Sequence, residues 1–171
     1  MALTIQRLDL ITDWLEIVKQ RLLSENFSLE NIGDDKIFIE YYTLQNRKVS
    51  TKIRSIKKSP VFSCPPELQS GLELLESKIT NGENIRPHQS RSLKNLSIKD
   101  GMLFDWNIHH FHLGTEIESD GFIKRTGPLL YAYVDEDNIY FLQILEHGNW
   151  TKEDLIRIIH ENWPEAIAHA K

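Results

Sequence analysis

Three of the chain's seven histidines lie within four residues of one another, at His109, His110 and His112. Side chains alternate between the two faces of a β-strand. In a strand, His110 and His112 would therefore share one face, and His109 would point to the other face as a core group. Imidazoles with an ordinary pKa of about 6.5 can take up and release protons at neutral pH. His110 and His112 are thus a candidate general acid–base pair.

Two more residues can complete this candidate site. His147 follows the last long apolar run of the chain, and Arg125 precedes the central one. In a sheet built from neighbouring strands, both side chains would approach the histidine pair. Arginine binds phosphate and stabilises developing negative charge. Together the four residues favour cleavage of RNA through the ribose 2′-hydroxyl, with no metal ion or other cofactor.

The same histidines fit two other interpretations. His110 and His112, with His147 as a third ligand, suit a zinc ion that keeps one open coordination position. The protein would then be a metal-dependent hydrolase. Alternatively, the histidines are structural groups in a non-catalytic protein that binds another protein. The sequence leaves these interpretations open.

Basic residues are concentrated in the middle of the chain, although the formal net charge is −5. No acidic residue interrupts the stretches 47–58 and 84–99, whereas acids gather at 116–120 and 135–137. A basic surface can bind the phosphate backbone of RNA, although an ordinary solvated face has the same composition. The candidate RNA-binding residues are Lys48, Lys52, Arg54, Arg86 and Arg91.

Apolar periodicity predicts a helix and a β-hairpin in the N-terminal half. Apolar residues recur every three or four positions over residues 4–24, which indicates an amphipathic helix. Residues 36–43 alternate and are rich in Ile, Phe and Tyr, which is typical of a strand. Residues 47–56 alternate as well and predict the returning strand, with one basic face.

The rest of the chain predicts a helix and then a compact β module. Leucines spaced as on one helix face, a preceding Pro-Pro pair and a final Asn-Gly predict a helix over 65–82. Strands are expected within 102–113, 126–134 and 139–145, and Thr151 is expected to cap a last helix that Pro164 ends. The predicted fold class is α+β: an N-terminal helix and β-hairpin, then a curved antiparallel sheet with a C-terminal helix. The regions are 1–82, a polar basic loop over 83–100, and 101–171.

Composition and missing motifs exclude several classes of protein. The only cysteine, Cys64, excludes an internal disulfide and favours a reducing compartment. No apolar run approaches the roughly 20 residues that span a bilayer, and the N-terminus lacks the features of a signal peptide. There is no glycine-rich phosphate loop and no Gly-x-Ser-x-Gly motif. We therefore expect a cytoplasmic protein with no membrane partner.

The stretch from Arg125 to Val134, with 139–145 and His147, resembles the central hairpin of RelE-type toxins. These toxins belong to a wider group of small ribonucleases that includes barnase, EndoU and colicin nucleases. The resemblance covers about the last third of the chain. It implies a curved antiparallel sheet whose RNA site is lined by Arg125 and His147. Paired histidines are used in EndoU-like members of the group.

The leading expectation is a metal-independent endoribonuclease of the toxin or phage-defence type. His110 and His112 would be acid and base, while His147 and Arg125 would support the phosphate. Its partners would be RNA and a protein antitoxin or immunity protein. The alternative is a non-catalytic binding protein of the immunity or antitoxin kind, and the third interpretation is a His-ligated zinc hydrolase.

Overall fold

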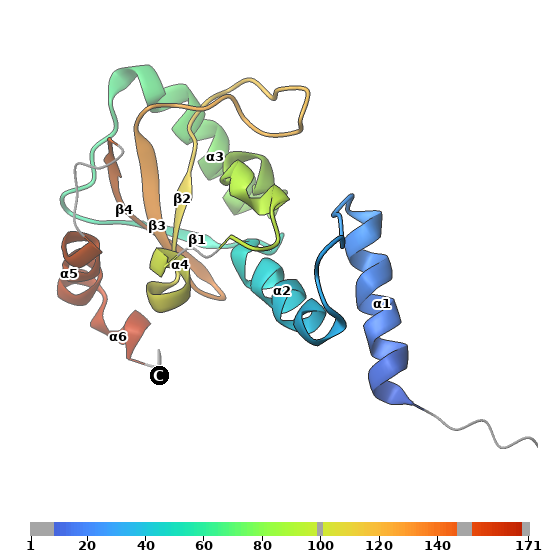
Figure 1. Ribbon diagram of the computed structural model, residues 1–171. Coiled ribbons are helices and arrows are strands. Elements are labelled where there is room, and N and C mark those ends of the chain that lie inside the picture. Colours follow the sequence, from blue (N-terminus) through green and yellow to red (C-terminus); the bar gives the residue numbers. More distant parts are fainter. Residues whose placement is uncertain (1–8, 99–100, 147–151, 169–171) are drawn as a thin grey trace, which may run out of the picture. The chain divides into compact units, whose positions relative to one another are not determined.

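The computed structural model describes residues 9–98, 101–146 and 152–168 (Figure 1). The chain forms two compact units, and each is described by itself. One unit comprises Met1–Arg47 and Leu93–Ile98, and the other comprises Lys48–Ser92 and Lys99–Lys171. Each unit is thus assembled from two stretches of sequence.

The first unit contains a pair of helices, α1 (Leu10–Ser24) and α2 (Asp34–Arg47). Asp9 caps α1, since its carboxylate accepts a hydrogen bond of 3.2 Å from the Thr12 N–H. The amphipathic N-terminal helix is therefore confirmed over the described residues. The two helices contact each other. Their buried apolar residues are Val18 and Leu22 of α1 and Ile37, Tyr41 and Leu44 of α2.

Helix α2 occupies the place of the first strand of the predicted β-hairpin, so that prediction is wrong. Residues 36–43 do alternate, but Ile37, Tyr41 and Leu44 also follow the i, i+4, i+7 spacing of one helix face, and this face is buried. Acids at Asp34 and Asp35 in the first turn, with a basic residue in the last turn, complement the helix dipole. The returning strand is wrong as well, because only Ser55–Lys58 within that region is a strand.

The second unit is built on a four-stranded sheet in the order β1 (Ser55–Lys58), β4 (Asn138–Leu145), β3 (Leu129–Val134), β2 (Ile108–Phe111). Strands β2, β3 and β4 are antiparallel, and the predicted hairpin of β3 and β4 is confirmed with Val134 opposite Ile139. Strand β1 lies parallel to β4, so the sheet is mixed rather than wholly antiparallel. The strand expected within 102–113 is shorter, because α4 (Gly101–Trp106) takes its first part.

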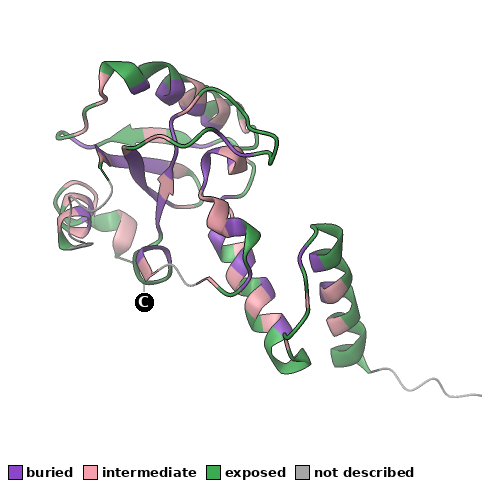
Figure 2. Ribbon diagram, turned by 45° about the horizontal axis from the view of Figure 1, so that its top comes forward, coloured by how far each residue is buried: buried purple, intermediate pink, exposed green. Residues whose placement is uncertain are grey.

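Helices cover both faces of this sheet (Figure 1). On one face, α3 (Gln69–Asn81), which follows the 3-10 turn η1 (Pro66–Leu68), packs its buried leucines against Phe111 and Phe141. On the other face, α5 (Lys152–Asn162) places Leu155 and Ile159 against the sheet, and α6 (Pro164–Ile167) follows it. Figure 2 shows the central strands buried between these layers. The α+β class, the helix over 65–82 and the C-terminal helix are confirmed.

The polar stretch 83–100 contains two 3-10 turns, η2 (Arg86–His88) and η3 (Arg91–Lys94), and no strand among its described residues. Part of this stretch is buried, although its polar composition is typical of an exposed loop. His88 is fully buried, with 0% of its surface exposed, and Gln89 is 4% exposed. His88 and Gln89 contact the histidines at 109 and 112 and therefore belong to the candidate site.

Candidate functional site

The histidines of β2 alternate as the strand pattern predicts. The ring of His109 lies beside Phe111, with 6.2 Å between the ring centroids, on the face covered by α3. The ring of His110 lies 6.2 Å from the ring of Tyr131, which belongs to the opposite face. His109 is buried and His110 is half-buried. His109 is therefore the core group that the sequence indicated.

His112 lies beyond the end of β2 and is buried, with 8% of its surface exposed. The backbone N–H of Thr126 donates to its Nδ1 over 3.4 Å, so Nε2 carries the proton in the neutral ring. Burial, with the positive charges of Arg125 and Arg91 in the surroundings, lowers the pKa of His112 to about 4. At pH 7 this ring is neutral and cannot act as the acid of an acid–base pair.

His112 is tied to His88 by a reciprocal pair of hydrogen bonds. The His112 N–H donates to the His88 carbonyl over 2.7 Å. The His88 Nδ1 lies 2.9 Å from the His112 carbonyl oxygen, and since a carbonyl only accepts, Nδ1 must carry the proton. The Nε2 lone pair of His88 is then buried without a hydrogen-bond partner. Burial lowers the pKa of His88 to about 4.

His109 is held in a similar way through Gln89. The Val49 N–H donates to Gln89 Oε1 over 3.2 Å, which orients the amide so that its Nε2 donates to His109 Nδ1 over 3.4 Å. Burial, with the nearby His110 and Arg54, lowers the pKa of His109 to about 3. This ring is also neutral at pH 7.

We call His88, Gln89, His109 and His112 the histidine lock. The lock joins residues 85–92 to β2 and to the backbone that follows it. His88 and Gln89 lie in the stretch 83–100, whose composition predicts a polar loop, and neither residue is among the predicted site residues. One available signal was the buried apolar pair Ile85 and Leu93, which flanks these residues and argues against an exposed loop.

Of the remaining members of the predicted catalytic group, the described residues include Arg125 and not His147. Arg125 is exposed, and its charge acts on His112. His147 lies outside the described residues, so its approach to His110 stays a prediction. Within the described ranges, no group of three His, Cys, Asp or Glu side chains is placed to hold a metal ion.

Three of the five predicted RNA-binding residues are engaged inside the second unit. Arg91 binds Asp120 over 2.7 Å and also binds Glu118. The Lys52 ammonium lies 3.5 Å from Asp137 and 3.6 Å from Glu136. Acidic side chains therefore compete with phosphate for both cations. Arg54 is the third engaged residue. The remaining two candidates, Lys48 and Arg86, are half-buried.

Arg54 is buried and holds two segments together, so we call it the Arg54 clamp; it is not a surface cation. Its guanidinium donates to the Asp135 carbonyl over 3.1 Å and to the Ser50 carbonyl and hydroxyl over 2.7 Å each. Only 6% of its surface is exposed. It therefore joins the start of β1 to the turn between β3 and β4. The prediction that Arg54 lies on a basic hairpin face is wrong, because the residues before Ser55 do not form a strand.

Replacing Arg54 with Met is expected to lower the free energy of unfolding by about 3 kcal/mol, because three charge-assisted hydrogen bonds from a buried side chain disappear. Urea denaturation measures the change. Lys52→Met is the matched control, and since its ion pairs are more exposed it should cost less than about 1 kcal/mol. Equal losses in the two variants would contradict the clamp.

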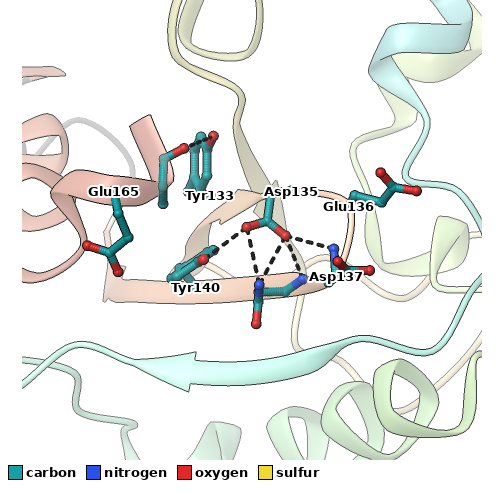
Figure 3. Close-up of a pocket in the computed structure, with 8 residues that line it drawn as sticks. Tyr133, Asp135, Glu136, Asp137, Tyr140 and Glu165 are labelled. Carbon is teal, nitrogen blue, oxygen red and sulfur yellow. Dashed lines mark hydrogen bonds between the residues drawn. The ribbon is translucent and has the colours of Figure 1, made fainter. Parts of the chain in front are cut away.

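A cavity of about 590 Å³ lies at the turn between β3 and β4 (Figure 3). Four carboxylates line it, from Asp135, Glu136, Asp137 and Glu165, together with the rings of Tyr133 and Tyr140. The dashed lines join the Tyr133 hydroxyl to the Ala166 carbonyl and the Asp135 carboxylate to Asp137, Asn138 and Tyr140. Asp135 accepts from the N–H groups of Asp137 and Asn138 and from the Tyr140 hydroxyl, and these bonds outweigh burial and lower its pKa.

Comparisons with known proteins return no relative. No family model matches the chain, and neither the curated proteins nor the solved structures contain a match. Among the described helices, none is both long and apolar enough to cross a membrane. The function must therefore be argued from the chain's own geometry.

Proposed function

We propose that the protein is a non-catalytic binding module that recognises another protein through α1, with its buried histidines in a structural role. This is the binding-protein alternative of the sequence analysis. The state of His112 supports it over the endoribonuclease, because a buried ring with a pKa of about 4 is a poor partner for His110 in proton transfer at pH 7. The basic residues that were candidates for RNA binding are largely engaged internally.

The observation that carries the proposal is the exposed apolar row on α1. Leu10, Trp14 and Ile17 follow one helix face at the i, i+4, i+7 spacing, and their exposed fractions are 74%, 37% and 41%. The buried residues Val18 and Leu22 lie on the neighbouring side of α1, which packs on α2. Figure 2 shows this division, with α1 mainly exposed away from α2. Helix α1 therefore has an apolar surface that α2 covers only in part.

The spacing of the row indicates the kind of partner. Large apolar side chains at i, i+4 and i+7 are the anchors with which a helix enters an apolar groove of another protein. Trp14 is suited to the centre of such an interface, because tryptophan is enriched among the residues that dominate binding energy. Arg21 lies over its ring, with 5.5 Å from the guanidinium carbon to the ring centroid, and also donates to Tyr41. The proposed partner is therefore a protein with an apolar groove one helix wide.

Charge and truncation variants on α1 test the proposal. Ile17→Glu and Trp14→Ala are each expected to weaken the complex at least 30-fold, since each removes an anchor of about 2 kcal/mol or more. Gln20→Glu, on an exposed position of the same helix, is the control and should bind as wild type does. The partner is first identified by crosslinking in cells, and the dissociation constants are then measured by calorimetry with purified components. Circular dichroism checks that every variant keeps its helices.

Two results would contradict the binding module. One is equal affinity of wild type and the two α1 variants for the isolated partner. The other is cleavage of RNA by the purified protein that is lost in His110→Ala, which would restore the endoribonuclease. Incubation of RNA with and without a chelator separates that enzyme from the zinc hydrolase, because only the latter loses activity when metal is removed.

A further inference from the structure

In each imidazole of the histidine lock, the ring nitrogen that is free to take up a proton can do so only at the cost of a hydrogen bond or of a buried donor without an acceptor. Nδ1 of His112 accepts the Thr126 N–H, and Nδ1 of His109 accepts the Gln89 amide. A proton on either nitrogen would place a donor against a donor and break that bond. The fixed orientation of Gln89 by Val49 prevents the amide from turning to compensate.

Protonation of His88 has a different but equally unfavourable result. Its Nδ1 already carries a proton, so an added proton must go to Nε2, which is buried and has no partner. A buried charged donor without an acceptor is strongly destabilising. The whole lock therefore depends on neutral rings.

The charged side chains that act on the lock are all basic. Lys78 of α3 faces His88, and Arg54 faces His109. Arg91 and Arg125 face His112, and the imidazole of His110 lies near both His109 and His112. None of these groups would stabilise an added positive charge, and the acids Asp120 and Glu118 beside Arg91 are engaged with its guanidinium.

We propose that the histidine lock is an acid-operated latch, in which protonation of His88, His109 and His112 releases residues 85–92 from β2 while the sheet remains folded. The released segment would lose its contacts to the backbone at His112 and Ile123, whose N–H groups donate to His88 and Pro87. The strands β3 and β4 do not depend on these bonds, because their ladder is formed with each other. The inference is independent of the binding function proposed for α1.

The pKa values set the direction and the range of the effect. The folded values of about 4, 3 and 4 lie below the value of about 6.5 for a free histidine, so release takes up protons as the pH falls below 6.5. Each ring that release transfers to water then favours release about tenfold at pH 5.5. His88 leaves with the segment, whereas His109 stays on β2 and His112 just after it. The opening equilibrium is therefore expected to rise by a factor between about 10 and on the order of 1000 between pH 7.5 and pH 5.5.

Amide hydrogen exchange followed by NMR tests the latch on the full chain. The reporters are the N–H groups of Val49, His112 and Ile123, which are bonded to the segment or to Gln89. After correction for intrinsic exchange, their protection is expected to fall by at least about tenfold between pH 7.5 and pH 5.5. Amides of the β3–β4 ladder are expected to keep at least 100-fold more protection than the reporters at pH 5.5.

Variants separate the lock from other titrating groups. His109→Gln removes one titrating ring from the histidine lock, so the change in protection should shrink, by at most about tenfold. His160→Gln, which alters an exposed histidine of α5, should leave it unchanged. The latch is wrong if wild-type reporter protection is the same at both pH values, or if the reporters at pH 5.5 are as protected as the β3–β4 ladder. The wild-type pH series decides the question even if His109→Gln fails to fold.

Discussion

The free energy of unfolding of this protein is expected to fall by roughly 5 kcal/mol between pH 7 and pH 5. The folded pKa values of His88, His109 and His112 are about 4, 3 and 4, and the unfolded value is about 6.5. Because the folded values are lowered, the stabilisation is complete above pH 6.5 and is lost as the pH falls towards 4. A natural domain is stable by only about 5–15 kcal/mol, so this loss removes at least about a third of its stability.

Urea denaturation at pH 7, 6 and 5, followed by tryptophan fluorescence, measures this loss. In His109→Gln the slope of stability against pH should fall by about a third, since one of three titrating groups is gone. The exposed His160 is again the control, and His160→Gln should keep the wild-type slope. Asp135 contributes in a separate window, because its lowered folded pKa makes it lose stability only below about pH 4. A stability that is constant from pH 7 to pH 5 would contradict the burial of these rings.

The fold of the C-terminal part could be predicted from local sequence because its signals do not conflict. Strands β3 and β4 are nearly continuous apolar runs joined by a polar turn, and both faces of these strands are buried. The leucine spacing of α3 and the Gly82 that ends it, with a φ of 68°, are equally clear. In each case the local pattern and the tertiary environment favour the same element.

The N-terminal hairpin could not be predicted correctly because its pattern fits two structures. In residues 36–43 the apolar side chains match both a period of two and a helix face. Packing against α1 selects the helix, and this choice depends on a second element rather than on the segment itself. The strand β1 is short for a related reason: its partner is β4, more than 80 residues later, so no local turn signals it.

In the candidate site too, features that depend on neighbouring residues could be predicted, and features that depend on residues far away along the chain could not. Alternation along β2 predicted the opposite faces of His109 and His110, because alternation is a local property of a strand. The role of His112 depends on His88, which is 24 residues away along the chain. No periodic pattern connects these two positions, so the burial of His112 and its hydrogen bonds to His88 could not be predicted from the strand pattern.

Replacing Gly71 with Ala is expected to destabilise the protein by more than about 4 kcal/mol, although alanine is normally the better helix former by about 1 kcal/mol. Gly71 lies in α3, and a Cβ atom there would be 1.6 Å from the Leu113 carbonyl oxygen and 2.4 Å from the carbonyl carbon. Both atoms belong to backbone, so no flexible side chain can move aside. The helix or the chain after His112 must shift, and either movement opens the core around Phe111.

Thermal unfolding measures this effect, and a fall in Tm of about 10 °C is expected for Gly71→Ala. Ser70→Ala is the matched control, because Ser70 is exposed in the same turn and its variant should stay within about 2 °C of wild type. Since Leu113 directly follows His112, a shift at this contact should also loosen the histidine lock, and the His112 N–H should lose protection at pH 7. A Gly71→Ala variant with wild-type Tm would show that α3 does not lie this close to the chain after β2.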